Sequence, residues 1–366
     1  VDELQERIEE KRETITVVPG EGNVLGVWGY LGDLYAFRNK SGGVTAGMFK
    51  ATPAGWTEID LGTALNFDGT TLNGEMVIGA VLTGAGGATG TIAGVSYHGN
   101  WDTGAEGTVV LTDVTGTYVD DEVLTMPTIS FDGGDVEILV GDVVQGLTSG
   151  ETATVKKIQL ASGAWSTDDA AGDLSVIDNT GTWTDGEEIH VLGAKRAIVD
   201  GASQPSGKTI ANAYGTQYAQ TIQPNGTYDF VNFNFQGEEG TETMYGANGV
   251  DNAFEFDGTN FAKIRTGTDS DIPNYVEAYK NHLFLSFANG TIMNSGLQLP
   301  TVFSTTMGAA TIVVGDSVTG LSVESKDALA VFGRNNTYVL YGKNDADWNL
   351  TTFYTGSGAV DGTVQK

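Results

Sequence analysis

One stretch of the sequence matches a motif for phosphate chemistry. Residues 202–209 end in Gly207-Lys208-Thr209 and fit a relaxed phosphate-binding loop. Such a loop needs a buried strand before it and a helix after it, so that backbone N–H groups converge on the phosphate. The residues that follow reach Gly215 too soon for a supporting helix. The segment is therefore interpreted as a linker that leaves an inserted region.

Two acidic segments, Asp113–Glu122 and Asp178–Glu187, share one pattern of Asp, Thr, Gly and Glu. Clustered carboxylates can hold Ca²⁺, which binds six to eight oxygen atoms. The spacing fits no EF-hand loop, and Asp and Gly are also the residues that turns require. Turn formation is the favoured interpretation, and a Ca²⁺ site is the alternative.

The three histidines, His98, His190 and His282, lie far apart in the sequence. Neither helical nor hairpin spacing pairs them, so a metal site or a catalytic triad is not predicted. Nothing selects one pair of acidic residues for glycoside hydrolysis over another. The sequence thus yields no catalytic, cofactor-binding or metal-binding residue, and we do not expect an enzyme.

The composition indicates a β-rich, acidic protein. Glycine accounts for 52 of 366 residues, about twice the usual ~7%, which favours an all-β fold with many turns. The net charge is −29, and phosphate binding needs clustered Lys and Arg, so wrapping of nucleic acid is disfavoured. There is no cysteine for a disulfide and no apolar run long enough for a membrane-spanning helix. Because the chain lacks an initiator Met and ends inside an expected strand, we expect a processed or truncated chain.

A repeated hairpin organises the sequence. Two apolar runs flank a short polar turn in Leu329–Tyr341, and Leu283–Asn294 repeats this around Asn289-Gly290, a strong hairpin signal. A weaker copy begins at Met244, so the starts are 39 and 46 residues apart. This spacing predicts four-stranded units of the size of a propeller blade. The expected core residues of these hairpins are Phe284, Phe287, Phe332 and Tyr338.

The strand predicted after Pro224-Asn225-Gly226 has alternating aromatic residues. Its expected inward positions are Tyr228, Val231, Phe233 and Phe235, with a bulge near Phe230. Residues 24–65 are expected to form a similar β unit, preceded by an arm, 1–23, with a short helical pattern in its first fourteen residues.

A tandem repeat lies between residues 66 and 206. Landmarks from Gly84 to Glu122 recur from Gly146 to Glu187 in the same order, with offsets of 62 to 65 residues. Each copy is expected to be a small β module with a buried Trp. Core candidates are Trp101 and Tyr118 in the first copy, and Trp165 and Trp183 in the second. The predicted domains are the arm, a β-propeller-like domain of 24–65 and 207–366 that would be incomplete in a truncated chain, and inserted modules at 66–135 and 136–206.

The segments Tyr279–Gly296, Leu329–Gly342 and Asp347–Leu350 resemble tail proteins of tailed bacteriophages, in particular the β-propeller nozzle or conduit proteins of short-tailed phages. The similarity covers about 24–65 and 207–366, and residues 66–206 are similar to small β repeats inserted in phage structural proteins. It implies an all-β chain with propeller-like repeats of antiparallel strands and an inserted pair of tandem β modules.

The resemblance also implies a function. It implies a virion structural protein of the tail, which forms a homo-oligomeric ring for DNA exit and contacts other tail or portal-adaptor proteins. DNA would pass without specific binding, and no cofactor is expected. The alternative is a tail-spike or surface adhesin that binds host glycan through the inserted modules, which exposed Trp101 and Trp165 would favour. A propeller glycosidase would need two carboxylates about 5–9.5 Å apart in one cleft.

Overall fold

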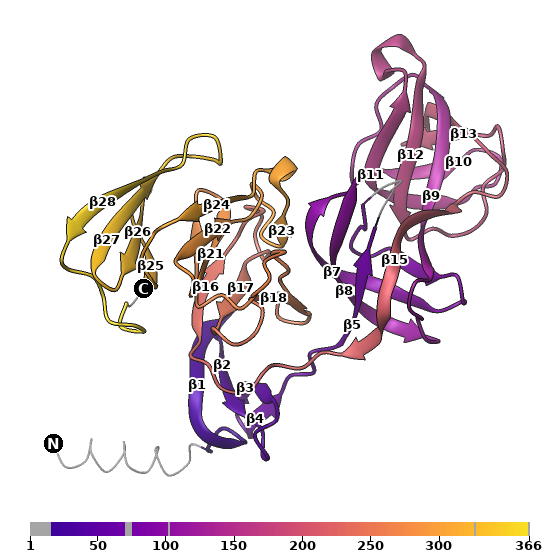
Figure 1. Cartoon of the computed structure of the whole chain (residues 1–366). Coiled ribbons are helices and arrows are strands. Elements are labelled where there is room, and N and C mark those ends of the chain that lie inside the picture. The colour runs from indigo at the N-terminus through magenta and orange to yellow at the C-terminus, as the bar shows by residue number, and fades with distance from the viewer. Residues whose placement is uncertain (1–15, 70–74, 102, 326, 365–366) are drawn as a thin grey trace, which may run out of the picture. The chain divides into compact units, whose positions relative to one another are not determined.

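The computed structural model describes residues 16–69, 75–101, 103–325 and 327–364 (Figure 1). It is an all-β structure built from several antiparallel sheets. Within the described ranges, the helices are two single turns, η1 (Trp165–Thr167) and η2 (Thr305–Met307). The helical pattern predicted for the first fourteen residues lies outside the described residues. The chain divides into two compact units: residues up to 62, 96–98 and 219 onward form the first, and residues 63–95 and 99–218 form the second.

The first unit contains four four-stranded sheets, each made of strands in chain order. The predicted hairpins supply the second and third strands of the last two sheets, and Met244 lies in the second strand of the sheet before them, so the repeat of four-stranded units is confirmed. The first sheet has β1 (Glu21–Tyr30), β2 (Asp33–Asn39), β3 (Ala46–Thr52) and β4 (Gly55–Glu58). The second has β16 (Asp229–Phe233), β17 (Thr243–Ala247), β18 (Phe254–Phe256) and β19 (Phe261–Lys263). The third has β20 (Tyr275–Tyr279), β21 (His282–Phe287), β22 (Thr291–Asn294) and β24 (Ala310–Val313), and the fourth has β25 (Val318–Ser325), β26 (Ala328–Gly333), β27 (Asn336–Tyr341) and β28 (Asn349–Thr355).

Successive sheets of the first unit pack face to face. One apolar cluster joins the first and second sheets, another the second and third, and a third cluster joins the third and fourth. The first strands of the four sheets, β1, β16, β20 and β25, lie beside one another in that order. Since the middle sheets are covered on both faces, their strands have apolar residues on both sides, and every residue of β21 is buried.

This two-sided burial corrects the prediction for β16. The strand pairs with β17 in unbroken register from Asp229 to Phe233, so the predicted bulge near Phe230 is absent. Phe230 is buried against the first sheet, whereas Val231 and Phe233 pack toward the third. The expectation of one apolar face was wrong because both faces of this strand are apolar.

The second unit contains two circuits of strand pairing that share one long strand, β9 (Val123–Gly134). The first circuit, here called module 1, passes from β9 through β6 (Val81–Gly84), β7 (Thr89–Asn100), β8 (Gly104–Thr115), β5 (Thr63–Asp68) and β15 (Ser206–Ala219) back to β9. The second circuit, module 2, passes through β12 (Ala170–Ile177), β11 (Thr152–Ser162), β10 (Val143–Gly146), β13 (Glu188–Val191) and β14 (Ala194–Val199) back to β9. Residues 97 and 98 of β7, which group with the first unit, pair in parallel with β23 (Val302–Phe303).

The second unit begins at Thr63 and extends to Tyr218, whereas the sequence placed its ends at residues 66 and 206. The difference at the far end is β15, which pairs with the first half of β9 and completes module 1. Small and polar residues dominate this strand, so its hydrophobic period is weak. The segment that matches a phosphate-binding loop runs into β15, and a strand therefore stands where the motif requires a helix.

Candidate functional site

The two modules contain equivalent aromatic stacks. Trp101 stacks on Phe67 with ring centroids 5.3 Å apart, and Trp165 stacks on Phe131 at the same distance. Trp101 is 5% exposed, but Trp165 is only partly buried, so the expected equivalence in burial is incomplete. Residue 165 lies in η1 outside the strands, where its ring covers Gly134 and is only partly buried. A pair of exposed Trp platforms, as the adhesin alternative would use, is not present.

Sequence reasoning missed Phe67 and Phe131, the partners of these Trp side chains. The signal was there, since Phe67-Asp68-Gly69 and Phe131-Asp132-Gly133 are separated by the same 64 residues as the two tryptophans. The two other core candidates are fully buried: the Tyr118 hydroxyl donates to the carbonyl of Leu82 at 2.7 Å, and Trp183 Nε1 donates to Asn179 Oδ1 at 2.9 Å.

The two acidic segments end in buried carboxylates that bind backbone N–H groups. Glu122 accepts hydrogen bonds from Gly86 at 2.8 Å and Val119 at 2.9 Å. Glu187 accepts from Thr148, Ser149 and Thr184 at 2.6 to 2.9 Å. These bonds close the turns between strands, which is the turn interpretation favoured from the sequence.

Burial and hydrogen bonding oppose each other at Glu187. Burial raises the pKa of its carboxyl group, but the N–H groups of Ser149, Thr184 and Thr148 stabilise the ionised form, and the net effect is a lowered pKa. A Cβ at Gly146 would come within 2.7 Å of the Glu187 carboxylate, and one at Gly84 within 2.5 Å of Glu122. The paired glycines of the repeat therefore make room for the paired carboxylates.

The described residues contain no group of three or more His, Asp or Glu side chains arranged to hold a metal ion. His190 contacts Glu188 at 2.8 Å in module 2. His282 is buried in the third sheet, where Nδ1 lies 2.7 Å from the carbonyl of Ser295. His98 lies beside Gly267 in the first unit.

Lys208, the lysine of the phosphate-loop pattern, forms an ion pair with Asp173. Asp173 also accepts a hydrogen bond from the Ser130 hydroxyl at 2.8 Å. Burial lowers the pKa of Lys208. The three side chains come from β15, β12 and β9, so they link these three strands where β9 passes from module 1 to module 2. This use of the lysine is structural.

The core candidates of the first unit differ in burial. Phe284 and Phe287 on β21 are buried. Phe332 and Tyr338 in the fourth sheet are partly exposed. Tyr338 packs at the margin of the apolar cluster between the third and fourth sheets. Phe332 points to the other face of the fourth sheet because the neighbouring Val331 occupies the packed face.

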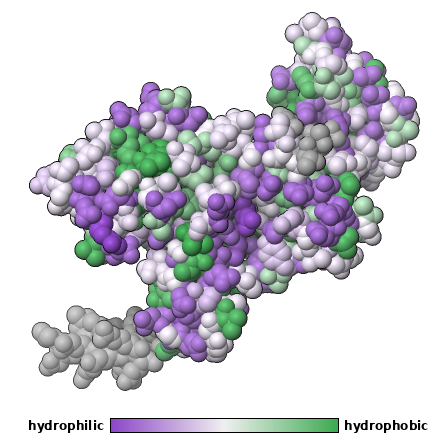
Figure 2. Space-filling view, viewed as in Figure 1, coloured by the Kyte–Doolittle hydropathy of each residue, from purple (hydrophilic) through white to green (hydrophobic). Residues whose placement is uncertain are grey.

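All the charged residues in the first strands of the four sheets are acidic. These strands contain Glu21, Asp229, Glu277 and Glu324 and neither Lys nor Arg. No Lys or Arg occurs between Lys50 and Lys156 either, a stretch that includes most of module 1. The face drawn in Figure 2 is mostly hydrophilic, with hydrophobic side chains in separate patches. The four first strands and the stretch between Lys50 and Lys156 therefore lack the clustered cations that bind phosphate groups.

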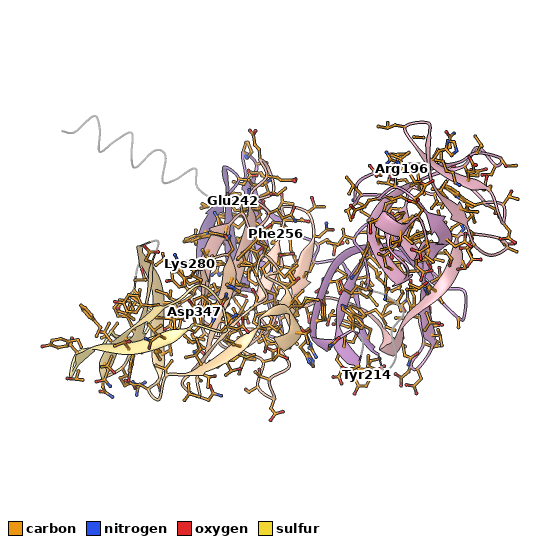
Figure 3. All side chains as sticks on the ribbon, turned by 90° about the horizontal axis from the view of Figure 1, so that it is seen from above. Arg196, Tyr214, Glu242, Phe256, Lys280 and Asp347 are labelled. Carbon is orange, nitrogen blue, oxygen red and sulfur yellow. The ribbon has the colours of Figure 1, made fainter. Side chains whose placement is uncertain are left out.

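Glu242 lies close to the packed region between the first and second sheets. The Tyr30 hydroxyl donates to the carbonyl of Glu242 at 2.7 Å, and its ring meets Phe256 edge-on; Figure 3 labels Glu242 and Phe256. On β18, Glu255 Oε2 accepts from the Tyr245 hydroxyl at 3.0 Å. Burial raises the pKa of Glu255 to about 7, with a smaller contribution from Asp257, although the Tyr245 hydrogen bond lowers it.

No protein-family model matches this chain, and neither does any curated protein sequence. Of the helices in the described part of the chain, none is long and apolar enough to cross a membrane.

Proposed function

We propose that this chain is a structural subunit of a bacteriophage tail. Further copies join it in a ring that acts as the nozzle or conduit for DNA leaving the virion. The proposal starts from the resemblance of Tyr279–Gly296, Leu329–Gly342 and Asp347–Leu350 to nozzle proteins. Those segments lie in the third and fourth sheets, or in the turns beside them.

The observation that carries the proposal is the arrangement of the four sheets in the first unit. Four consecutive four-stranded sheets pack face to face, and their first strands lie beside one another. Successive blades of a β-propeller have this order, with the first strand of each blade innermost. We therefore interpret the four sheets as propeller blades, and the second unit as a pair of modules inserted between the first blade and the second.

The charge of the chain supports the part of the proposal that concerns DNA. Each contact of Lys or Arg with phosphate adds salt-dependent attraction, which would slow a passing duplex. The net charge is −29, and the stretch from Lys50 to Lys156 contains no cation between its ends. A wall of this composition repels DNA, as a conduit requires.

The competing functions have less support. The adhesin alternative needed exposed Trp101 and Trp165, but Trp101 is buried and its ring lies against Phe67. A role as a hydrolase gains no support from the acidic repeat residues Glu122 and Glu187, because backbone N–H groups engage both carboxylates. We therefore place the function in shape and charge.

Two measurements test the proposal. Cryo-electron microscopy of virions that contain this protein should place it in a ring around the tail axis, with the four-sheet units of neighbouring copies in contact. Titration of duplex DNA should show no binding by electrophoretic mobility at 50 to 150 mM salt, about the range over which cation-rich proteins lose most of their affinity. A monomeric subunit that touches no neighbouring copy in intact virions, or tight binding of DNA at moderate salt, would refute the proposal.

A further inference from the structure

A cavity of about 280 Å³ lies at one end of the second and third sheets in the first unit. Its polar side chains come from segments far apart in the sequence: Asp229 begins β16, Asn248 follows β17, Asn274 precedes β20, Tyr275 begins β20, and Asp361 lies in the C-terminal segment. None of the residues predicted from the sequence lines it except Tyr228. The cavity plays no part in the proposed conduit.

Hydrogen bonds hold these side chains in place. Asp229 Oδ2 accepts the N–H of Val276 at 2.9 Å, which links the second sheet to the third. The Tyr275 hydroxyl donates to Asp361 and accepts the N–H of Gly362 at 3.1 Å. The cavity is therefore built before any ligand arrives, which lowers the entropy lost on binding.

Two amide side chains, Asn248 and Asn274, also line the cavity. Asn248 Oδ1 accepts the N–H groups of Val250 at 3.1 Å and Asp251 at 2.9 Å, which fixes the orientation of this amide. The Asn274 amide lies over Gly249, where a Cβ would be 3.2 Å from Nδ2. Gly249 has a φ of 73°, which a side chain disfavours, and its lack of a side chain keeps this part of the cavity open.

The lining excludes two classes of ligand. It contains no Lys, Arg or His, and Asp229 and Asp361 repel phosphate and carboxylate groups. It is mainly polar, so an apolar ligand would leave Asn and Asp groups without hydrogen-bond partners, which disfavours its binding. A ligand of this cavity must be uncharged or cationic, and polar over most of its surface.

We propose that the cavity binds one neutral sugar residue of a glycan. A sugar hydroxyl both donates and accepts hydrogen bonds, so it matches a lining in which carboxylates accept and side-chain amides donate. The volume falls just below the range of about 300–1,000 Å³ that is typical of drug-sized ligands. It therefore suits a single sugar ring with its neighbours in solvent.

The test uses the full chain and four probes, glucose, galactose, mannose and N-acetylglucosamine, each at up to 20 mM. Saturation-transfer NMR should detect binding of at least one of them, with a Kd near the millimolar range. Asp361→Asn and Asn274→Ala should each weaken that binding about tenfold, because the first replaces a charged acceptor with an amide that can also donate, and the second removes an amide. Asp345→Asn, an exposed aspartate outside the cavity, is the matched control and should bind as the wild type does.

Thermal unfolding of each variant shows that it is folded. If a variant does not fold, hydrogen exchange of the wild type is measured instead. Added sugar should then slow the exchange of backbone amides in residues 227–229, 248–249 and 274–275. Failure of all four sugars to bind overturns the proposal, and so does binding that Asp361→Asn and Asn274→Ala leave unchanged. A titration with CaCl₂ alone tests whether the cavity binds a cation instead. If Ca²⁺ binds to the wild type but not to Asp361→Asn, and no sugar binds, the cavity is a cation site and the proposal is overturned. None of these outcomes bears on ring assembly.

Discussion

Glu255 offers a direct test of how the second sheet is held together, because its burial makes the stability of the first unit depend on pH. Its pKa rises from an ordinary 4.5 to about 7 in the folded protein. The difference, 7 minus 4.5, is about 2.5, and each pKa unit corresponds to about 1.4 kcal/mol. Ionised Glu255 therefore destabilises the folded state by at most about 3–4 kcal/mol relative to the protonated form.

The sign follows from which state holds the proton. Between pH 4.5 and 7 the folded state keeps a proton that the unfolded state has lost, so this contribution to stability falls as the pH rises through that window. Above pH 7 both states are ionised and the full penalty applies. Gln cannot ionise and can still accept the hydrogen bond from Tyr245, so Glu255→Gln removes the penalty and keeps the contact.

Urea unfolding at pH 4.5 and pH 8 measures the effect, together with hydrogen exchange of β17 and β18. We expect Glu255→Gln to match the wild type within about 0.5 kcal/mol at pH 4.5 and to exceed it by about 1–3 kcal/mol at pH 8. Glu239→Gln, at an exposed position near the same sheet, is the control and should change neither value. An equal difference between Glu255→Gln and the wild type at both pH values would refute the reasoning, because it would show that ionisation of Glu255 is not what destabilises the sheet.

Three further predictions concern the second unit. Trp101→Ala should destabilise module 1 by about 3–5 kcal/mol, and Trp165→Ala should destabilise module 2 by less because its ring is partly exposed, as thermal unfolding would show; equal losses would contradict this. Glu187→Gln should lower the free energy of unfolding by about 1–3 kcal/mol at pH 7. This loss should shrink as the pH falls below the usual range of a carboxyl group, because the Glu187 carboxylate, whose pKa is lowered, stabilises the fold only while it is ionised. Glu137→Gln, at an exposed position, is the control in urea unfolding. Replacement of residues 63–218 by a short Gly linker should leave a first unit that unfolds cooperatively in calorimetry, and a broad, non-cooperative transition would count against it.

The local signals in the sequence predicted the strands of the first unit well. The β21–β22 hairpin has Asn289-Gly290 at its turn, and Gly290 adopts a φ of 78°, so a turn residue and its backbone conformation agree. The same agreement of turn and flanking apolar runs predicted β26 and β27. Hairpins whose strands and turn lie close together in the sequence could therefore be predicted from the sequence alone.

The features that depend on distant segments were not predictable in this way. The strand β15 belongs to module 1 because it pairs with β9, with paired residues 78 to 89 positions apart, and its small residues give no strong period of their own. The burial of Phe230 depends on the first sheet, which lies on the other side of the inserted region. The polar cavity is assembled from four segments, so no single stretch of sequence contains it.

The join between the first unit and the inserted region explains why the two can be separate units. The N–H of Gln220 donates to the carbonyl of Gly62 at 2.9 Å, so the chain leaves the first unit and returns to it at adjacent points. The Gln220 side chain is buried, and Nε2 donates to the carbonyls of Leu61 at 2.6 Å and Phe261 at 2.7 Å. With both ends held together in this way, the entropy of closing the loop depends little on what lies between them. The four sheets can therefore keep their packing whatever the length of the inserted region, and the modules are free to fold on their own strand pairings.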